Sequence, residues 1–271
     1  RQSKRYDVKT AGFAIPEGPA ALAEGQRLFR ARGCAECHGD DAGGKTFIDE
    51  PPLGRIVASN LTSATAKYTT EDWSRAVRHG LAPDGRPLVM MPAHEYWAYG
   101  DADLGQIVAF VASLPVVSRP LPAHDLGALS HVLHVFGAFP LLPAELIDHD
   151  KPRPAPPAII PSAEFGGYLA AGCTGCHGAT LAGGPIPGAP QAAVGIPSNL
   201  TPHETGLGKW TEADFRTLLR TGKRPDGTEV NAKWMPWGVY KYMSDTEIAA
   251  VWAYVSKLPA KSSASMPGWV A

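Results

Sequence analysis

Apolar side chains recur at helical spacing in three segments of the first half of the chain, and the same three segments return in the second half. The opening segment covers residues 19–32 and has its counterpart over residues 162–172. The middle segment begins at Thr69 or at Thr211, and each threonine is followed three residues later by an aspartate. This spacing is a variant of the capping box, which marks the start of a helix.

A closing segment begins near Asp101 in the first half and at Ser244 in the second, where Glu247 completes a full capping box. Its apolar residues fall three or four positions apart, which predicts an amphipathic helix with one face in a core. We therefore expect an all-α fold with roughly three short helices in each half and long loops between them.

Glycine and proline are abundant between these segments, with 29 and 26 residues, about a fifth of the 271-residue chain. Such a composition favours irregular loops over long bundles or extended sheets. Proline is densest between the halves, where residues 151–157 favour an extended, semi-rigid spacer.

Helical periodicity persists in part of this proline-rich connector, over residues 126–136, and we expect that part to pack across the two domains. The expected organisation is an N-terminal extension 1–18, a first domain 19–117, a connector 118–160 and a second domain 161–271.

The charge balance excludes one broad class of partner. With 25 basic and 26 acidic residues, a formal net charge of −1, nothing in the chain favours binding to nucleic acid. No run of about 18 apolar residues is present, which argues against a transmembrane helix in this sequence. Because the chain starts without Met and without a signal peptide, we expect a processed or truncated product with an upstream segment.

A short motif occurs once in each half: Cys34-Ala35-Glu36-Cys37-His38 and Cys173-Thr174-Gly175-Cys176-His177. This C-x-x-C-H run is the attachment signal for a c-type haem. Two cysteines three positions apart lie about one helical turn from each other, so both thiols can reach the two vinyl groups along one haem edge. The histidine that follows becomes the proximal ligand of the iron. The motifs use all four cysteines, and we expect two covalently bound haems c.

Two other uses of cysteine pairs fit less well. A four-cysteine zinc site usually has its second pair about 15–20 residues away, whereas these pairs are 139 residues apart and each is followed by histidine. A thioredoxin-like redox pair belongs to a βαβ pattern, which this sequence lacks.

The two halves are diverged copies of one unit. Each motif histidine is followed 22 residues later by Asn-Leu-Thr, at residues 60–62 and 199–201. Each half then reaches a Met-Pro pair, at Met91 or Met235, that lies 23 residues before a closing Leu-Pro. The shared position favours these methionines as the distal iron ligands, because proline fixes an extended loop that can hold a thioether. Packing of the same side chains on the haem face is the alternative.

Histidine is the rival distal ligand. His/Met ligation raises the reduction potential and closes the iron to substrate, which favours electron transfer over catalysis. The remaining histidines have no partner at the equivalent place in the other half, and we expect surface, connector or supporting positions for them. They are His79, His94, His124, His131, His134, His149 and His203.

Several other side chains are candidate haem contacts. We expect the run of residues 51–54, which includes Pro52, to place a backbone carbonyl on the second ring nitrogen of His38, with Pro190 as its counterpart for His177. Two asparagines, each with a threonine two residues on, either bond haem propionates or cap the next turn. These are Asn60 and Asn199, and further propionate candidates are Tyr68, Trp210 and Arg55.

The second half resembles the class I cytochrome c fold through Gly167-Tyr168-Leu169 ahead of its motif, residues 198–211, Met235-Pro236-Trp237 and residues 244–248. The first half matches more loosely. The whole chain is similar to two tandem domains of this kind and, more closely, to the multihaem cytochrome c subunits of membrane-associated alcohol and gluconate dehydrogenases. Those subunits usually carry three haems, and this chain has two motifs.

The resemblance implies a dihaem protein that carries single electrons. Its donor would be a dehydrogenase or a quinol-oxidising complex, and its acceptor an oxidase or another cytochrome. It also implies a periplasmic location, commonly with attachment to the inner membrane, and residues 1–9 would suit the start of the part beyond an N-terminal anchor. A dihaem peroxidase or small-molecule oxidase with one open haem is the main alternative, and a sensor of CO or NO is a third.

Overall fold

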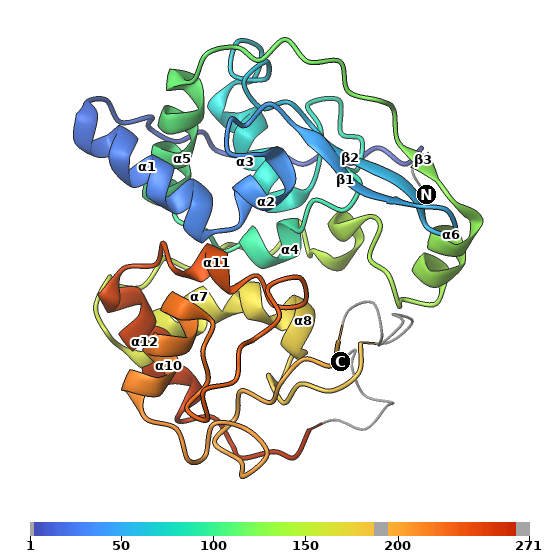
Figure 1. Ribbon diagram of the computed structural model, residues 1–271. Helices are drawn as coiled ribbons and strands as arrows, with labels where there is room; N and C mark the ends of the chain where they lie inside the picture. Colours follow the sequence, from blue (N-terminus) through green and yellow to red (C-terminus); the bar gives the residue numbers. More distant parts are fainter. Residues whose placement is uncertain (1–2, 187–194, 264–271) are drawn as a thin grey trace. The chain divides into compact units, whose positions relative to one another are not determined.

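The computed structural model describes residues 3–186 and 195–263 of the chain (Figure 1). Contacts between residues divide it into two compact units, residues 1–155 and 156–271. Short helices joined by long loops dominate both units. Within the described ranges, no helix has the length and apolar character needed to cross a membrane.

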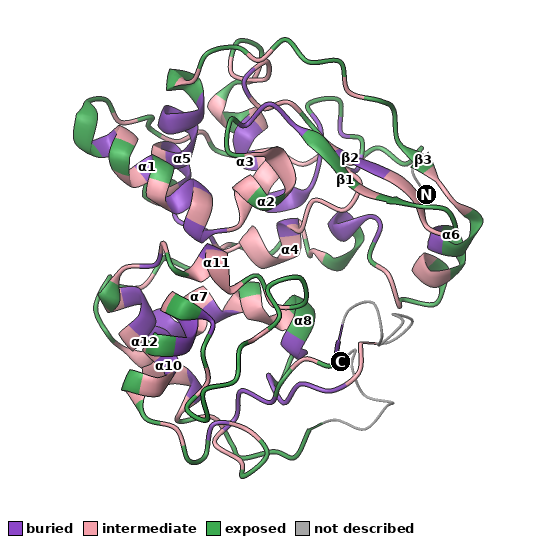
Figure 2. Cartoon of the chain, viewed as in Figure 1, coloured by how far each residue is buried: buried purple, intermediate pink, exposed green. Residues whose placement is uncertain are grey.

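The first unit is built on two helices that cross in its core. Leu28 and Phe29 of one helix pack on Phe110 and Val111 of the other, all of them buried, and the centroids of the two phenylalanine rings lie 5.6 Å apart. The helices of this unit are α1 (Pro19–Ala31), α2 (Cys34–His38), α3 (Thr70–His79), α4 (Ala93–Tyr96), α5 (Asp101–Ser113) and α6 (Ala128–Val135), with the 3-10 turn η1 (Pro143–Leu146). Figure 2 shows buried stretches on both α1 and α5.

Glycine brings the crossing helices into backbone contact. A Cβ added at Gly25 of α1 would collide with the carbonyl oxygen of Gln106 in α5. A side chain at this position would therefore push the two helices apart.

The second unit repeats this arrangement. Gly166 of α7 meets the carbonyl oxygen of Ala250 in α12 in the same way, and Phe165 and Ile248 are buried there. Its helical elements are α7 (Ala163–Ala170), the 3-10 turn η2 (Ala171–Cys173), α8 (Thr174–His177), α10 (Glu212–Thr221), α11 (Trp237–Tyr240) and α12 (Asp245–Val255).

The expected capping boxes are present. Thr69 accepts from the backbone N–H of Asp72, whose carboxylate accepts from the N–H of Thr69, and Thr211 does the same with Asp214. Ser244 starts α12 with a third such box. These boxes satisfy backbone donors that the first turn of a helix leaves free, which explains why the sequence located the starts of three helices.

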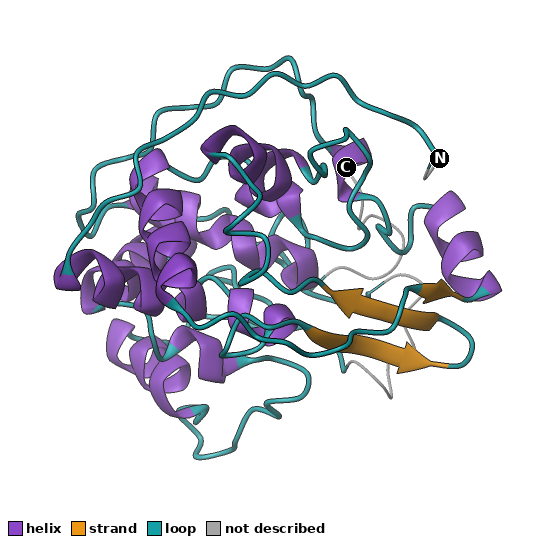
Figure 3. Ribbon diagram, turned by 90° about the horizontal axis from the view of Figure 1, so that it is seen from above, coloured by secondary structure: helices purple, strands orange, loops and turns teal. Residues whose placement is uncertain are grey.

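The all-α expectation needs one correction: the first unit contains a small antiparallel sheet (Figure 3). Strand β1 (Lys45–Glu50) pairs with β2 (Gly54–Ala58), which pairs with β3 (Asp125–Leu126). The fold is therefore mostly α. The sequence of β1 does not alternate between apolar and polar residues, because both faces of this strand are largely exposed. Periodicity therefore could not predict it.

Most of the proline-rich segment folds onto the first unit, with its boundary at residues 155 and 156. Leu141 and Leu142 are 1% and 2% exposed and pack with Ile56 of β2. The carbonyl oxygen of Leu141 also accepts a hydrogen bond from the N–H of Met90, at 2.8 Å. This segment therefore contributes core side chains as well as a connection.

Candidate haem-binding sites

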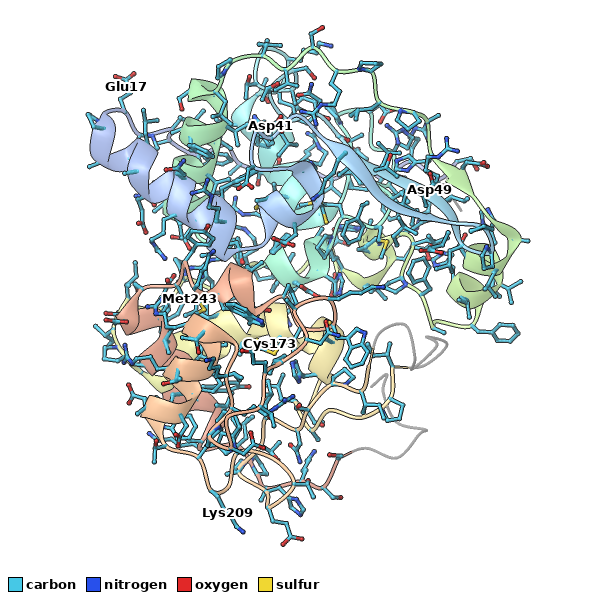
Figure 4. The ribbon with its side chains drawn as sticks, in the orientation of Figure 1. Glu17, Asp41, Asp49, Cys173, Lys209 and Met243 are labelled. Carbon is cyan, nitrogen blue, oxygen red and sulfur yellow. The ribbon has the colours of Figure 1, made fainter. Side chains whose placement is uncertain are left out.

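Each C-x-x-C-H motif lies on a short helical segment that ends at a glycine with positive φ, and in the first unit a second such glycine precedes it. Helix α2 follows Gly33, at φ 78°, and stops at Gly39, at φ 79°. In the second unit η2 and α8 carry the motif, and Gly178 ends it at φ 76° (Cys173 is labelled in Figure 4). Glycine adopts this left-handed conformation without steric cost. The two cysteines and the histidine thus share one helical turn in both units.

The four cysteine side chains are free of disulfides. Burial raises the pKa of Cys34 to about 12 and that of Cys37 to about 11. Both thiols are therefore neutral at pH 7. Among the described residues, no group of three or more His, Cys, Asp or Glu side chains could hold a metal ion.

The proximal histidines are oriented by the same backbone contact in both units. Nδ1 of His38 lies 2.8 Å from the carbonyl oxygen of Ser59, and Nδ1 of His177 lies 2.7 Å from that of Ser198. A carbonyl only accepts, so Nδ1 carries the proton and Nε2 keeps a free lone pair for a metal. Burial lowers the pKa of both imidazoles, which favours the neutral form that binds metals.

The prediction for Pro52 is wrong. This residue lies in the exposed turn between β1 and β2, and the carbonyl that orients His38 belongs to Ser59, directly before Asn60. The partner is a backbone group, which leaves no side-chain signature in the sequence. Pro190, the expected counterpart, lies outside the described residues.

A cavity of about 280 Å³ opens beside α2 in the first unit. Its walls are mainly apolar and include buried residues of the core, such as Trp73, Leu104 and Val108. An apolar cavity lined by two thiols and an imidazole fits a covalently held haem. Residues expected at this site that line the cavity are Cys34, Cys37, His38, Tyr68 and Met91.

The two Met-Pro pairs have matching backbones. Ala93 N–H donates to the carbonyl oxygen of Met91, and Trp237 N–H to that of Met235, both at 2.7 Å. The prolines that follow have φ, ψ of −77°, 53° and −76°, 60°. Met90 also lines the cavity and has a positive φ of 58°, so the first unit offers two neighbouring thioethers.

Asn60 and Asn199 form hydrogen bonds within the turn that follows the proximal histidine's backbone partner, and Asn60 does not line the cavity of the first unit. Oδ1 of Asn60 accepts from Thr62 and from the Ser63 N–H, while its Nδ2 donates to the carbonyl oxygen of Val117 at 2.7 Å. Nδ2 of Asn199 donates to the carbonyl oxygen of Lys261 at 2.6 Å. Asn60 ties the segment after α5, and Asn199 the segment after α12, to the turn that follows the carbonyl holding the proximal histidine. These are the contacts of the turn alternative, and a hydrogen bond to a haem propionate stays a prediction.

The remaining candidates for propionate binding differ in where they lie relative to the cavity. Arg55 does not line the cavity and forms an ion pair with Asp49, at 3.3 Å. Trp210 is partly buried at the end of its turn, and its role stays a prediction. Arg86 and His124 line the cavity and were missed. They lie in loops, where helical periodicity gives no guide to the direction of a side chain.

Three further histidines contact other titratable side chains. Nδ1 of His79 lies 2.9 Å from Nδ1 of His149, and Nε2 of His134 lies 3.4 Å from Glu145. Burial, followed by the charge of His149, lowers the pKa of His79 to about 4. These side chains support the fold between α3 and the segment around η1.

A helical turn with two thiols and an anchored imidazole, present in both units and opening on an apolar cavity in the first, defines a domain that attaches haem covalently. The chain belongs to the cytochrome c family: the family model for cytochrome c matches residues 22–115 and again residues 166–259. The protein therefore has two cytochrome c domains and two covalently bound haems c.

Curated relatives span most of the chain. It is 26% identical to the fructose dehydrogenase cytochrome subunit of Gluconobacter japonicus, over 89% of this chain and 53% of the relative. The diheme cytochrome c-type of Cereibacter sphaeroides is 27% identical, over 92% of this chain and 88% of the relative. The cytochrome c subunit of alcohol dehydrogenase (quinone) from Gluconacetobacter polyoxogenes is 26% identical, over 92% and 59%. The chain thus spans about half to three-fifths of the two dehydrogenase subunits.

Proposed function

We propose that the protein carries single electrons through two haems c, each held by histidine and methionine. His38 pairs with Met91 in the first domain and His177 with Met235 in the second. The observation that carries this proposal is the repeat itself: both domains hold Nδ1 of the histidine on a serine carbonyl and place Met-Pro in the same turn. An enzyme would need one iron with an open position, whereas both copies supply the same pair of ligands.

The partner proposed as electron donor is a dehydrogenase. Relatives that span most of this chain are named as cytochrome subunits of fructose, alcohol and gluconate dehydrogenases. A quinol-oxidising complex is the second source of electrons, and an oxidase or another cytochrome would accept them. We also propose a periplasmic location with attachment to the inner membrane, which covalent haem attachment and the dehydrogenase subunits among the relatives support.

Spectroscopy of the oxidised holoprotein tests the closed-iron proposal. Two His/Met haems give purely low-spin ferric signals and a methionine-to-iron charge-transfer band that accounts for both irons. Reduction by a quinone-dependent dehydrogenase should then consume two electrons for each chain. A persistent high-spin component, or rapid reaction with peroxide, would support a dihaem peroxidase or oxidase instead.

A further inference from the structure

A buried carboxyl group lies one turn beyond the proposed distal ligand of the first haem. The side chain of Glu95, on α4, is 15% exposed, although an ionised carboxylate is costly to bury without a partner. Its ion-pair partner is His94, whose Nε2 lies 3.9 Å away. Two polar atoms of neighbouring residues, His94 Nδ1 and Trp97 Nε1, are buried without a hydrogen bond.

The second domain has an apolar residue, Val239, at the position that corresponds to Glu95. Helices α4 and α11 follow their Met-Pro pairs with the same backbone: the N–H of Glu95 donates to the carbonyl oxygen of Pro92 at 3.0 Å, and that of Val239 to Pro236 at 2.9 Å. Val239 is 7% exposed. Glu95 therefore occupies, in the first domain, a place that the second domain fills with an apolar side chain.

Glu95 directly precedes a residue of the haem cavity wall. Its neighbour Tyr96 lines that cavity and donates a hydrogen bond to the carbonyl oxygen of Arg32, at 2.9 Å. The pKa of Tyr96 is raised first by burial and then, among smaller causes, by the charges of Cys34 and Glu95. Glu95 therefore adjoins a residue of the cavity wall without lining the cavity itself.

Charged groups on the packed elements do not neutralise Glu95. Helices α3 and η1 pack against α4, and their cations are engaged elsewhere: Arg75 with Asp72, and Arg78 with Asp101. Burial consequently raises the pKa of Glu95 to about 7. The other charged or titratable groups of these elements are Glu71, Asp72 and His79 on α3, and Glu145, which pairs with His134, on η1.

We infer that Glu95 takes up a proton when the first haem is reduced and releases it when that haem is oxidised, while the second haem lacks this coupling because Val239 stands at the matching position. The inference rests on the proposed electron-carrying function. The donor supplies one electron to the ferric iron, water supplies one proton, and the carboxylate becomes a carboxylic acid. A negative charge stabilises the ferric state more than the ferrous state, so the two events favour each other.

The sign of the pH dependence follows. As pH rises through the neutral range, Glu95 ionises and the potential of the first haem falls. The limiting slope is about 59 mV for each tenfold change in proton concentration, the one-electron value. The potential of the second haem should stay flat over the same range.

Redox titration of the dihaem holoprotein from pH 5 to 9 tests this inference. A Met235→Ala variant shifts the potential of the second haem, so the unshifted wave identifies the first. Glu95→Gln keeps the shape of the side chain and should abolish the slope of the first haem. Val239→Glu should give the second haem a slope of its own. His94→Gln is the matched control: it removes the imidazole that pairs with Glu95, so it should move the pH range of the slope without abolishing the slope.

Two results would overturn the inference: a slope that survives in Glu95→Gln, or one that disappears in His94→Gln while Glu95 is intact. Neither result affects the proposed function as long as both haems remain low-spin and reducible. A first haem that is high-spin at every pH would contradict the proposed ligation instead. Loss of the slope with an unchanged melting temperature in Glu95→Gln shows that the effect is electrostatic and not structural.

Discussion

Backbone hydrogen bonds orient the imidazoles of His38 and His177. Their Nδ1 atoms donate to the carbonyl oxygens of Ser59 and Ser198. The sequence predicted both histidines, because the spacing of the motif follows from the chemistry of haem attachment. It did not predict the serines, because any residue supplies the same carbonyl. Pro52 was chosen for its rigid backbone, but it lies in an exposed turn at the end of the sheet.

Replacement of the proposed distal ligands gives the sharpest prediction at this scale. Met91→Ala or Met235→Ala should convert one haem from low spin to high spin. It should also lower the potential of that haem by at least about 100 mV, a fraction of the roughly 0.8 V range that axial ligands set. Optical and electron paramagnetic resonance spectra of the ferric protein, with redox titration, measure both effects.

Met90→Ala is the matched control, because Met90 precedes Met91 and lines the same cavity. It should leave the spectrum low-spin. The opposite pattern, with Met91→Ala silent and Met90→Ala high-spin, would move the distal ligand by one residue. The sequence alone favoured Met91 because a Met-Pro pair recurs at the same position in the second half. The two Met-Pro turns have the same backbone hydrogen bond because both halves are copies of one repeated unit.

Among the elements, the helices that begin with a capping residue were predicted best. Thr69, Thr211 and Ser244 mark helix starts through side chains that bond the first turn. The sheet was missed because β3 is two residues long and reaches β2 from a distant part of the sequence. Pairing over such a distance depends on tertiary contacts, which local periodicity does not report.

Helix crossing is the element-scale feature that supports both domains, and Gly166→Ala tests it. The added methyl group would collide with the Ala250 carbonyl, a backbone group that cannot swing away. Overpacking of this kind costs typically about 1–3 kcal/mol, which exceeds the gain of about 1 kcal/mol in helix propensity. We expect a lower free energy of unfolding for the second domain, measured by denaturant titration.

Gly172→Ala provides the comparison for that variant. A Cβ at Gly172 meets no atom within 4 Å, so the free energy of unfolding should hardly change. Equal effects of the two substitutions would show that the contact between α7 and α12 does not set the stability. Gly25→Ala repeats the test in the first domain, against the carbonyl of Gln106.

For the whole molecule, the internal repeat predicted two domains, and the cytochrome c model matches one segment in each half. The C-terminal boundary of the first unit was harder to predict from the sequence. Proline-rich composition predicted a connector from residue 118, but the residues up to 155 belong to the first unit. Composition describes the local stiffness of a chain, whereas the burial of Leu141 and Leu142 depends on strand β2, which lies far away in the sequence.

Fragments of the chain can test whether the first domain ends at residue 117 or at residue 155. A fragment of residues 1–155 should fold and attach one haem, because it keeps β3, α6 and the leucines that cover Ile56. A fragment of residues 1–117 loses the contacts of Leu141 and Leu142, each worth about 1.5–3 kcal/mol as buried side chains, and the hydrogen bond from Met90 N–H to Leu141. The loop that precedes Met91 would then lose its support.

We expect the shorter fragment to attach less haem, or to hold it with a high-spin component, and to unfold at a lower temperature than the longer one. Covalent haem content, the ferric spectrum and the melting temperature of the two fragments give the answer. Residues 156–271 serve as the control, since this unit does not include the segment in question. Identical behaviour of fragments 1–117 and 1–155 would mean that residues 118–155 only connect the domains, and the first haem would then depend on nothing beyond residue 117.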